Sequence, residues 1–323
     1  IRLNPDNADA YDGRGWIHEK REQYDQVIAD FTQVIRLEPN NAGAYNSRGK
    51  AWAARQEYDK AVSDFDEAIR INPRYTSAYQ DRGSAWAEKK EYDRAIADFN
   101  AVLRLDANDI QALFERGSAW ENKREYDKAI ADYSAHIKLT EHVSGYINRA
   151  MCWYEKKEYD KTIADLDEAA RIEPLDVFIY QLRGEAWYTK KVYDKAIVDY
   201  DEAIRLDPND ASTYAARGRA WGRKGDNDRA IADFNEAIRI DPQDAEAFRD
   251  RGVAWNIKDE YGKALTDFDE AIRINPQDAT AFRERGVLRY YRKENDKALA
   301  DYDESIRLDP QDASARSDRG LLR

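Results

Sequence analysis

The chain repeats its sequence every 34 residues, and this period constrains the fold more than any other feature. Glycine keeps the step from Gly15 to Gly117, and it keeps the same step again after one residue is missing between Leu139 and Tyr146. Prolines follow the period at Pro5, Pro39 and Pro73, and then at Pro174, Pro208, Pro242, Pro276 and Pro310. An array of similar units grows by stacking, so its length indicates the number of repeats rather than the number of globular domains.

Counting from this register predicts nine full repeats. They span residues 8–41, 42–75, 76–109, 110–142, 143–176, 177–210, 211–244, 245–278 and 279–312. Residues 1–7 match the end of a preceding repeat, and residues 313–323 match the start of a further one. We therefore expect one continuous repeat array over residues 1–323.

Each repeat has the pattern of two helices joined by a short turn. In the second repeat, residues 58–71 carry apolar side chains on one helical face, at Tyr58, Ala61, Val62, Phe65, Ala68 and Ile69. Upstream, Tyr45, Gly49 and Trp52 share a face of an earlier helix, and polar residues around Gln56 separate the two helices. Pro73 ends the second helix, because proline has no backbone N–H to donate. The repeat is therefore predicted to be a helix hairpin.

This pattern resembles the tetratricopeptide repeat family, and the resemblance covers essentially the whole chain. The residues that carry it in the second repeat are Tyr45, Gly49, Trp52, Ala61, Phe65, Ala68 and Pro73. The resemblance implies an all-α fold, namely a right-handed superhelical solenoid of antiparallel helix hairpins. It also implies that the first helix of each hairpin lines a concave groove.

One departure from the family pattern is systematic. Where the family most often has leucine before the glycine, this chain has Arg14, Arg48, Arg82, Arg116, Arg149, Arg183, Arg217, Arg251 and Arg285. The second helices of the same repeats carry Asp30, Asp64, Asp98, Asp132, Asp165, Asp199, Asp233, Asp267 and Asp301. We expect each arginine to pair with its aspartate between packed helices, because a half-buried guanidinium needs a carboxylate. The alternative is a charged ladder that binds a ligand.

The groove positions implied by the resemblance differ from repeat to repeat. In repeats four to six they form an apolar set, Phe114, Ile147, Met151, Tyr154, Phe178 and Tyr188. In repeats seven to nine they are basic, with Arg219, Arg223, Arg249 and Arg283, followed by Tyr290 and Tyr291. In repeats two and three they are small or polar, at Gly43, Asn46, Ala53, Ser77, Gln80 and Ser84.

This distribution predicts a peptide-binding groove with an apolar middle and a basic far end. We expect the six apolar residues to form one continuous patch, matched to a partner that carries apolar anchors and acidic residues. In the alternative, Phe114 and Ile147 pack against the next hairpin. The arginines would then pair with nearby carboxylates, at Glu185, Glu246, Asp250 or Glu284.

Charge and composition narrow the class of partner. The net charge is −12, and acidic and basic residues are interleaved along the chain, so neither nucleic acid nor a membrane surface is an expected partner. Cys152 is the single cysteine, which excludes an intrachain disulfide and favours a cytoplasmic setting.

The sequence lacks the motifs of catalysis and of cofactor binding. It has no glycine-rich phosphate loop, nucleophile elbow or Cys-x-x-Cys motif. His136, His142 and Cys152 lie near one another in the sequence but lack a known metal-ligand spacing. We therefore expect no enzyme activity, no cofactor and no metal site.

Repetition of this kind builds an extended surface, so the primary hypothesis is a non-catalytic scaffold that binds a protein or peptide segment in its groove. The alternative is a structural role in which the chain stacks end to end into a dimer or filament, because an uncapped solenoid end is apolar.

Overall fold

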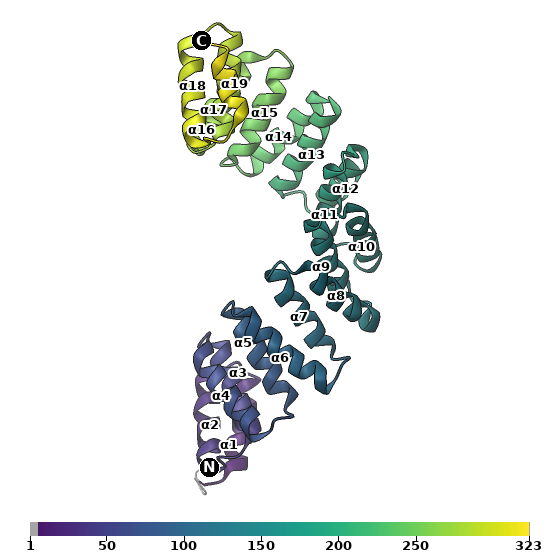
Figure 1. The fold of residues 1–323 in the computed structure, drawn as a ribbon, viewed down its shortest axis with the longest axis vertical. Helices are drawn as coiled ribbons and strands as arrows, with labels where there is room; N and C mark the ends of the chain where they lie inside the picture. Colours follow the sequence, from purple (N-terminus) through teal and green to yellow (C-terminus); the bar gives the residue numbers. More distant parts are fainter. Residues whose placement is uncertain (1–5, 323) are drawn as a thin grey trace. The chain divides into compact units, whose positions relative to one another are not determined.

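The computed structural model describes residues 6–322, and every regular element in that range is a helix (Figure 1). The helices are α1 (Ala8–Glu19), α2 (Tyr24–Leu37), α3 (Ala42–Ala54), α4 (Tyr58–Ile71), α5 (Thr76–Glu88), α6 (Tyr92–Leu105), α7 (Ile110–Asn122), α8 (Tyr126–Thr140), α9 (Val143–Glu155), α10 (Tyr159–Ile172), α11 (Val177–Thr189), α12 (Tyr193–Leu206), α13 (Ala211–Lys224), α14 (Asn227–Ile240), α15 (Ala245–Ile257), α16 (Tyr261–Ile274), α17 (Ala279–Tyr291), α18 (Asn295–Leu308) and α19 (Ala313–Gly320). The helix predicted over residues 58–71 is confirmed as α4. Residues 1–5, which the sequence assigns to a preceding repeat, lie outside the described range, as does Arg323.

The helices group into two compact units, divided in the sequence between Asp165 and Leu166, inside α10. In the first unit, α1 pairs with α2, α3 with α4, α5 with α6 and α7 with α8, and each second helix also contacts the first helix of the next hairpin. The second unit has the same arrangement from α11/α12 to α17/α18. The predicted all-α solenoid of antiparallel helix hairpins is thus confirmed within each unit, while one continuous array over the whole chain stays a prediction.

The first helices of neighbouring hairpins also touch one another. Contacts join α3 to α5 and α5 to α7 in the first unit, and α11 to α13, α13 to α15 and α15 to α17 in the second. We call the surface over α1, α3, α5 and α7 the first-helix face of the first unit. The surface over α11, α13, α15 and α17 is the first-helix face of the second unit.

Helix boundaries follow local chemistry. The side chain of Asn41 accepts the backbone N–H of Ala44 at 3.0 Å, and Asp278 accepts that of Ala281 at the same distance, so each caps the start of a first helix. The turn to the second helix passes through a residue with a left-handed backbone. Glycine takes that conformation most readily, and it occurs there at Gly225, with φ 87°.

In eight of the nine hairpins a glycine of the first helix packs against an aromatic ring of the second, and the fifth hairpin has Ala150 and Leu166 at these positions. A Cβ added at Gly49 would lie 2.6 Å from Cε1 of Phe65, and one added at Gly218 would lie 2.9 Å from Cε1 of Phe234. Both rings are buried, so the glycine is needed for the helices to approach this closely.

The predicted arginine–aspartate pairs form in all nine repeats. In the third repeat, Nε of Arg82 donates to Oδ2 of Asp98 at 2.9 Å, and Nη2 donates to Oδ1 at 2.6 Å. Asp98 is buried between α5 and α6. The structural interpretation of the ladder is therefore confirmed.

A second contact of these arginines was not predicted. Nη1 of Arg82 also donates to Asp66 on α4, in the preceding repeat. Likewise, Nη1 of Arg116 donates to Asn100 at 2.6 Å, and Nη1 of Arg217 donates to Asp201 at 2.6 Å. Each of these guanidinium groups therefore joins three helices from two consecutive repeats.

The irregular junction after the fourth repeat is built locally. Helix α8 is 15 residues long, whereas α6 has 14, and its C-cap residue Glu141 has a left-handed conformation with φ 50°. His136 is buried, with Nδ1 3.1 Å from the carbonyl oxygen of Ile110, and its ring centroid is 5.1 Å from that of Phe114. The histidine thus acts as a packing residue of α8. Within residues 6–322, no helix combines the length and the apolar character that crossing a membrane would require.

Candidate functional site

The apolar residues predicted for the groove divide between the two units. Phe114 is half-buried on α7 and packs within its own hairpin, with its ring centroid 5.6 Å from that of Tyr133 on α8. Ile147 and Met151 are half-buried on α9. Tyr154 makes an edge contact with Tyr159, with 5.3 Å between ring centroids.

In the second unit, Phe178 is 45% exposed near the start of α11, and Tyr188 near its end is half-buried. The ring centroid of Tyr188 lies 5.5 Å from that of Tyr193. Since the six apolar residues belong to both units, their union into one patch stays a prediction.

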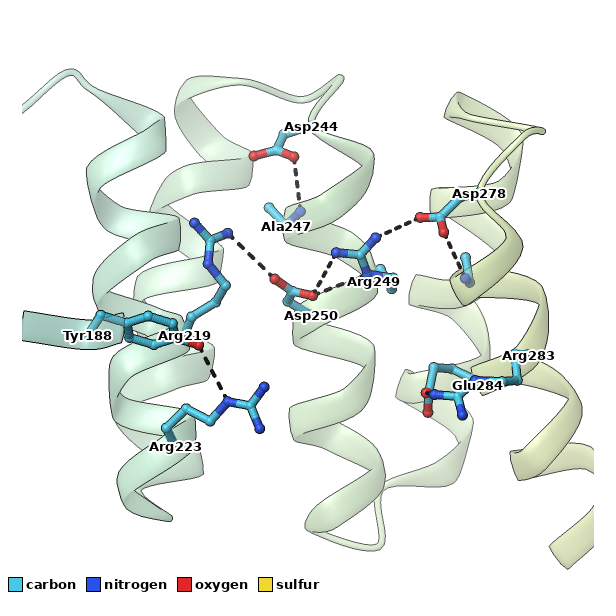
Figure 2. Close-up of polar contacts among 11 residues, drawn as sticks. Tyr188, Arg219, Arg223, Asp244, Ala247, Arg249, Asp250, Asp278, Arg283 and Glu284 are labelled. Carbon is cyan, nitrogen blue, oxygen red and sulfur yellow. Dashed lines mark hydrogen bonds and ion pairs between the residues drawn. The ribbon is translucent and has the colours of Figure 1, made fainter. Parts of the chain in front are cut away.

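The arginines predicted for the basic end of the groove are mostly paired with carboxylates (Figure 2). Nη1 of Arg249 donates to Asp278 at 2.9 Å, and Nη2 donates to Asp250 at 3.2 Å. Burial lowers the pKa of Arg249, but these two carboxylates outweigh that effect and raise it above the ordinary value. Arg283 donates to Glu284 at 2.6 Å.

Two of the four carboxylates considered as alternative partners, Asp250 and Glu284, do pair with groove arginines. Glu185 instead accepts the hydroxyl of Tyr200 at 3.2 Å. Arg219, Arg249 and Arg283 are therefore paired with neighbouring carboxylates, which balance most of the positive charge predicted for this end of the groove.

A pocket of about 370 Å³ opens on the first-helix face of the second unit. Four predicted groove residues line it, namely Tyr188, Arg219, Arg223 and Arg249. Its apolar lining includes Val253 and Ile257 from α15 and Ala230 and Phe234 from α14.

The pocket lies beside Gly222, a position at which other repeats carry a large side chain. Gly222 stands on α13 at the repeat position that Tyr154, Tyr188 and Tyr290 occupy in other repeats. The nearest side-chain atom to a Cβ added at Gly222 would be Cβ of Ala230, at 3.9 Å. Gly222 was not among the predicted groove residues, because that prediction rested on side chains that line the groove, whereas Gly222 contributes by leaving space.

One guanidinium at the pocket lacks a carboxylate partner. Nε of Arg223 donates to the hydroxyl of Tyr188 at 3.4 Å, and among residues 6–322 no carboxylate lies within ion-pair distance of it. Arg219 lies 3.6 Å from Oδ2 of Asp250 (Figure 2). Oδ1 of Asn227, also in the lining, is buried without a hydrogen-bond partner. The pocket thus combines apolar walls with one arginine that has no carboxylate within ion-pair distance.

A second pocket, of about 400 Å³, lies on the first-helix face of the first unit. Its lining includes Asn46, Gln80 and Asp81, and burial raises the pKa of the Asp81 carboxyl, an effect that the Asn46 amide partly offsets. Asn46 and Gln80 were predicted only as small or polar positions of the groove. Composition alone does not reveal whether a polar side chain has a partner.

At the far end of the second unit, Tyr290 is half-buried and Tyr291 is 73% exposed, with their ring centroids 5.7 Å apart. No group of three or more histidine, cysteine, aspartate or glutamate side chains within residues 6–322 is arranged to hold a metal ion.

Comparison with known proteins agrees with this architecture. The family profile described as "Tetratricopeptide repeat" matches residues 13–76, 56–110, 81–142, 215–279 and 258–313, and one described as "TPR repeat" matches residues 184–225. Residues 143–183, which include the irregular fifth repeat, lie between these matches. A comparison with curated proteins finds no match for the sequence.

Several solved structures share the fold. The C-terminal part of a TPR repeat-containing protein from Cytophaga hutchinsonii superimposes with a TM-score of 0.61 at 17% identity, over 73% of this chain and 97% of that chain. A tetratricopeptide repeat protein from Parabacteroides merdae gives 0.56 at 17% identity, over 76% and 98%. A chain of the APC/C hetero-tetramer Cut9–Hcn1 gives 0.55 at 15% identity, over 94% and 60%.

At these identities the structural matches establish the fold alone. The family profiles, however, cover more than half of the residues. The helix hairpins, the glycine–ring contacts and the 34-residue period agree with them. The chain therefore belongs to the tetratricopeptide repeat family and is built as a repeat scaffold.

Proposed function

We propose that this chain is a non-catalytic scaffold that binds a peptide segment of a partner protein on the first-helix face of its second unit. An apolar side chain of the peptide enters the pocket over Gly222, and an acidic residue beside it pairs with Arg223. The observation that carries the proposal is the pocket itself, which is lined by four of the residues predicted for the groove.

The size and lining of the pocket suit one large apolar side chain. At about 370 Å³ it falls in the range of small binding sites in proteins. Val253 and Phe234 supply apolar contact, and Ile257 is 61% exposed at the rim. Burying a leucine or phenylalanine side chain contributes about 1.5–3 kcal/mol, which is enough for a central anchor.

The charges around the pocket favour an acidic neighbour to that anchor. Arg249 and Arg219 already face Asp250, so a ligand carboxylate gains most from Arg223. An exposed charge pair of this kind raises the association rate more than it raises affinity. Within the second unit, the remaining predicted groove residues, Phe178, Arg283, Tyr290 and Tyr291, would lengthen the contact. Phe114, Ile147, Met151 and Tyr154 stay predicted groove residues of the first unit.

The proposal can be tested with a displayed library of random peptides selected on the wild-type protein. Selected peptides should share an aromatic or aliphatic residue next to Asp or Glu. Gly222→Tyr, which puts into the pocket the side chain that other repeats carry, should weaken their binding by about tenfold or more, equivalent to about 1.4 kcal/mol. Arg223→Glu should slow association and remove its salt dependence.

The matched control is Val198→Lys. Val198 is 64% exposed on α12, a second helix, and so lies away from the first-helix face. This variant should bind the selected peptides like the wild type. Peptides that bind Gly222→Tyr and the wild type equally well would contradict the proposal.

End-to-end self-association is the second candidate, and one observation favours it. On α1, Trp16 is 48% exposed and its neighbour Ile17 is 53% exposed, which places two large apolar side chains together on the surface. Sedimentation velocity over a range of concentrations should show association that Trp16→Glu reduces. A sedimentation coefficient that does not change with concentration would remove this candidate.

A further inference from the structure

Two surface positions of the second unit carry large apolar side chains where other repeats do not. Leu175, in the loop before α11, is 73% exposed, and Val198 on α12 is 64% exposed. In the other loops of equal length the position of Leu175 holds Asn, Arg or Gln, and in the other second helices the position of Val198 holds Ala, Ser or Thr. Since the hairpin forms elsewhere with polar or small residues at these positions, its fold does not require the two apolar side chains.

Lysines without carboxylate partners surround Val198. In other repeats an acidic residue at the start of the second helix pairs with a cation three residues on, as Glu260 does with Lys263 at 3.5 Å. The sixth repeat has Val192 at that position, and Nζ of Lys195 instead lies 4.1 Å from the ring centroid of Trp187. Lys195 is three residues from both Val192 and Val198, so it neighbours both on the helix surface.

A second exposed lysine, Lys191, precedes Val192 in the turn. Asp194, the nearest carboxylate in the sequence, is paired with Lys224. Within residues 6–322, no carboxylate lies within ion-pair distance of Lys191 or Lys195. We call Lys191, Val192, Lys195 and Val198 the turn-end patch, which combines apolar surface with two available positive charges.

The loop that carries Leu175 has the opposite charge. Glu173 and Asp176 flank the leucine, and among residues 6–322 no cation lies within ion-pair distance of either carboxylate. Asp176 caps α11 by accepting a backbone N–H of its first turn at 2.9 Å, and the carbonyl oxygen of Pro174 accepts the hydroxyl of Tyr180 at 3.1 Å. Residues 173–176, the loop-end patch, are therefore held by hydrogen bonds and present an aliphatic side chain between two negative charges.

The two patches cannot meet within one copy of the chain. The loop lies before α11 and the turn lies after it, so they stand at opposite ends of this helix. Helix α11 has 13 residues, which corresponds to a length of about 20 Å. Lys191 and Lys195 at the turn end are thus out of reach of Glu173 in the same molecule. A second copy can bring the loop of one molecule to the turn of another.

We propose that the loop-end patch of one copy docks on the turn-end patch of a second copy. Leu175 packs against Val198, and the carboxylates of the loop face Lys191 and Lys195 of the second copy. The contact is head-to-tail because the two patches differ, so a pair of copies still offers one patch of each kind to further copies. This contact uses the edges of the hairpins and involves neither the first-helix face nor the pocket over Gly222.

Charge complementarity favours a second copy as the occupant. The loop supplies the two features that the turn-end patch requires, namely an aliphatic side chain and adjacent carboxylates, and both patches belong to the ends of one helix hairpin. One loop against one helix end is small compared with the about 1,200–2,000 Å² of a stable interface, so the association is weak. It also decreases as the salt concentration rises, because exposed charges are screened.

Complementation between two variants tests the proposal. Every protein also carries Trp16→Glu, which removes any end-to-end association through α1. Leu175→Asn alters the loop-end patch, and Lys195→Gln/Val198→Ala alters the turn-end patch. Sedimentation velocity at low salt should show association of the parent, and each variant alone should need about tenfold more protein to associate. An equal mixture of the two variants should form dimers but nothing larger, because only one intact pair of patches remains.

The matched control is Lys263→Gln/Thr266→Ala, which makes the corresponding changes on α16 in the eighth repeat. It should associate like the parent, and all variants should keep the circular dichroism spectrum of the parent. A parent that stays monomeric at its highest soluble concentration would overturn the proposal. So would a mixture that associates no more than its two components, or variants that associate as readily as the parent.

Cross-linking gives an independent readout of which residues meet. Copies with Leu175→Cys and copies with Val198→Cys, mixed and mildly oxidised, should form a disulfide between molecules. Burial raises the pKa of the Cys152 thiol to about 12, so this residue should not compete. Ala232→Cys, at the equivalent exposed position of α14, is the control partner for Leu175→Cys. The mixed disulfide should form severalfold more with Val198→Cys than with Ala232→Cys, and equal yields would contradict the proposed contact.

Discussion

Two glycines on α13, one turn apart, should respond in opposite ways to the same substitution. A Cβ at Gly218 would lie 2.9 Å from Cε1 and 3.1 Å from Cζ of Phe234, which is almost fully buried. A Cβ at Gly222 would meet nothing closer than Ala230, at an ordinary contact distance of 3.9 Å. Gly218→Ala should therefore destabilise the fold, and Gly222→Ala should stabilise it.

The magnitude follows from two opposing effects. Alanine stabilises a helix interior by about 1 kcal/mol relative to glycine, and both substitutions should gain part of this helix-propensity energy. Inserting a carbon into a packed core costs about 1–3 kcal/mol, and only the Gly218 variant pays that cost. Since the helix contribution is common to both, the free energies of unfolding should differ by about 1–3 kcal/mol.

Urea unfolding followed by circular dichroism at fixed temperature measures this difference. Repeat proteins can unfold in stages, so the comparison uses transition midpoints of the two variants and the wild type under identical conditions. The double variant Gly218→Ala/Phe234→Leu should recover part of the loss, because the fifth repeat carries Ala150 and Leu166 at these two positions. Equal stabilisation by the two alanines would refute the reasoning.

Three further predictions concern charge and backbone. Burial raises the pKa of Glu121 above its ordinary value of 4.5, so ionisation of this carboxyl destabilises the fold as the pH rises. Glu121→Gln should therefore raise the midpoint of thermal unfolding at pH 7 but hardly at pH 4, and an equal rise at both pH values would contradict this. Gly225→Ala should lower the free energy of unfolding by about 1 kcal/mol, because the φ angle of 87° at this position disfavours a residue with a Cβ. Lys90→Gly, at the same repeat position, should raise the free energy of unfolding, and urea unfolding can measure both changes. Arg82→Leu should cost about 3 kcal/mol by leaving Asp98 buried without its partner, and adding Asp98→Leu should recover most of that loss; a double variant less stable than the single one would count against the pairing.

The fold could be predicted from the sequence because each of its determinants recurs. The spacing of Tyr58, Ala61 and Phe65 defines one helical face, and the fixed separation of Arg82 and Asp98 anticipates their ion pair. A period repeated nine times averages out local exceptions, so helix positions and the hairpin pairing follow from it. The second contact of the arginines from Arg48 onward could not be foreseen, because its acceptor changes identity between repeats, from Asp66 to Asn100.

The candidate site was less predictable, for two physical reasons. Pairing between side chains depends on rotamers, and Arg249 found a partner in Asp278, a carboxylate 29 residues away that also caps a helix. A pocket, moreover, is an absence of atoms, so the important residue is Gly222, which carries no side chain. The sequence shows that these positions vary between repeats, but it could not show which polar groups among them lack hydrogen-bond partners.

The three-helix contact of the ladder arginines has a consequence for how the length of this chain can change. In the second to ninth repeats the acceptor from the preceding repeat is a short polar side chain at an equivalent position, such as Ser134 for Arg149 and Asn235 for Arg251. If a block of 34 residues were excised or duplicated in register, each arginine would again find a short hydrogen-bond acceptor in its new neighbour. This arginine contact between repeats is thus interchangeable, so an array can lengthen or shorten by whole units and keep it.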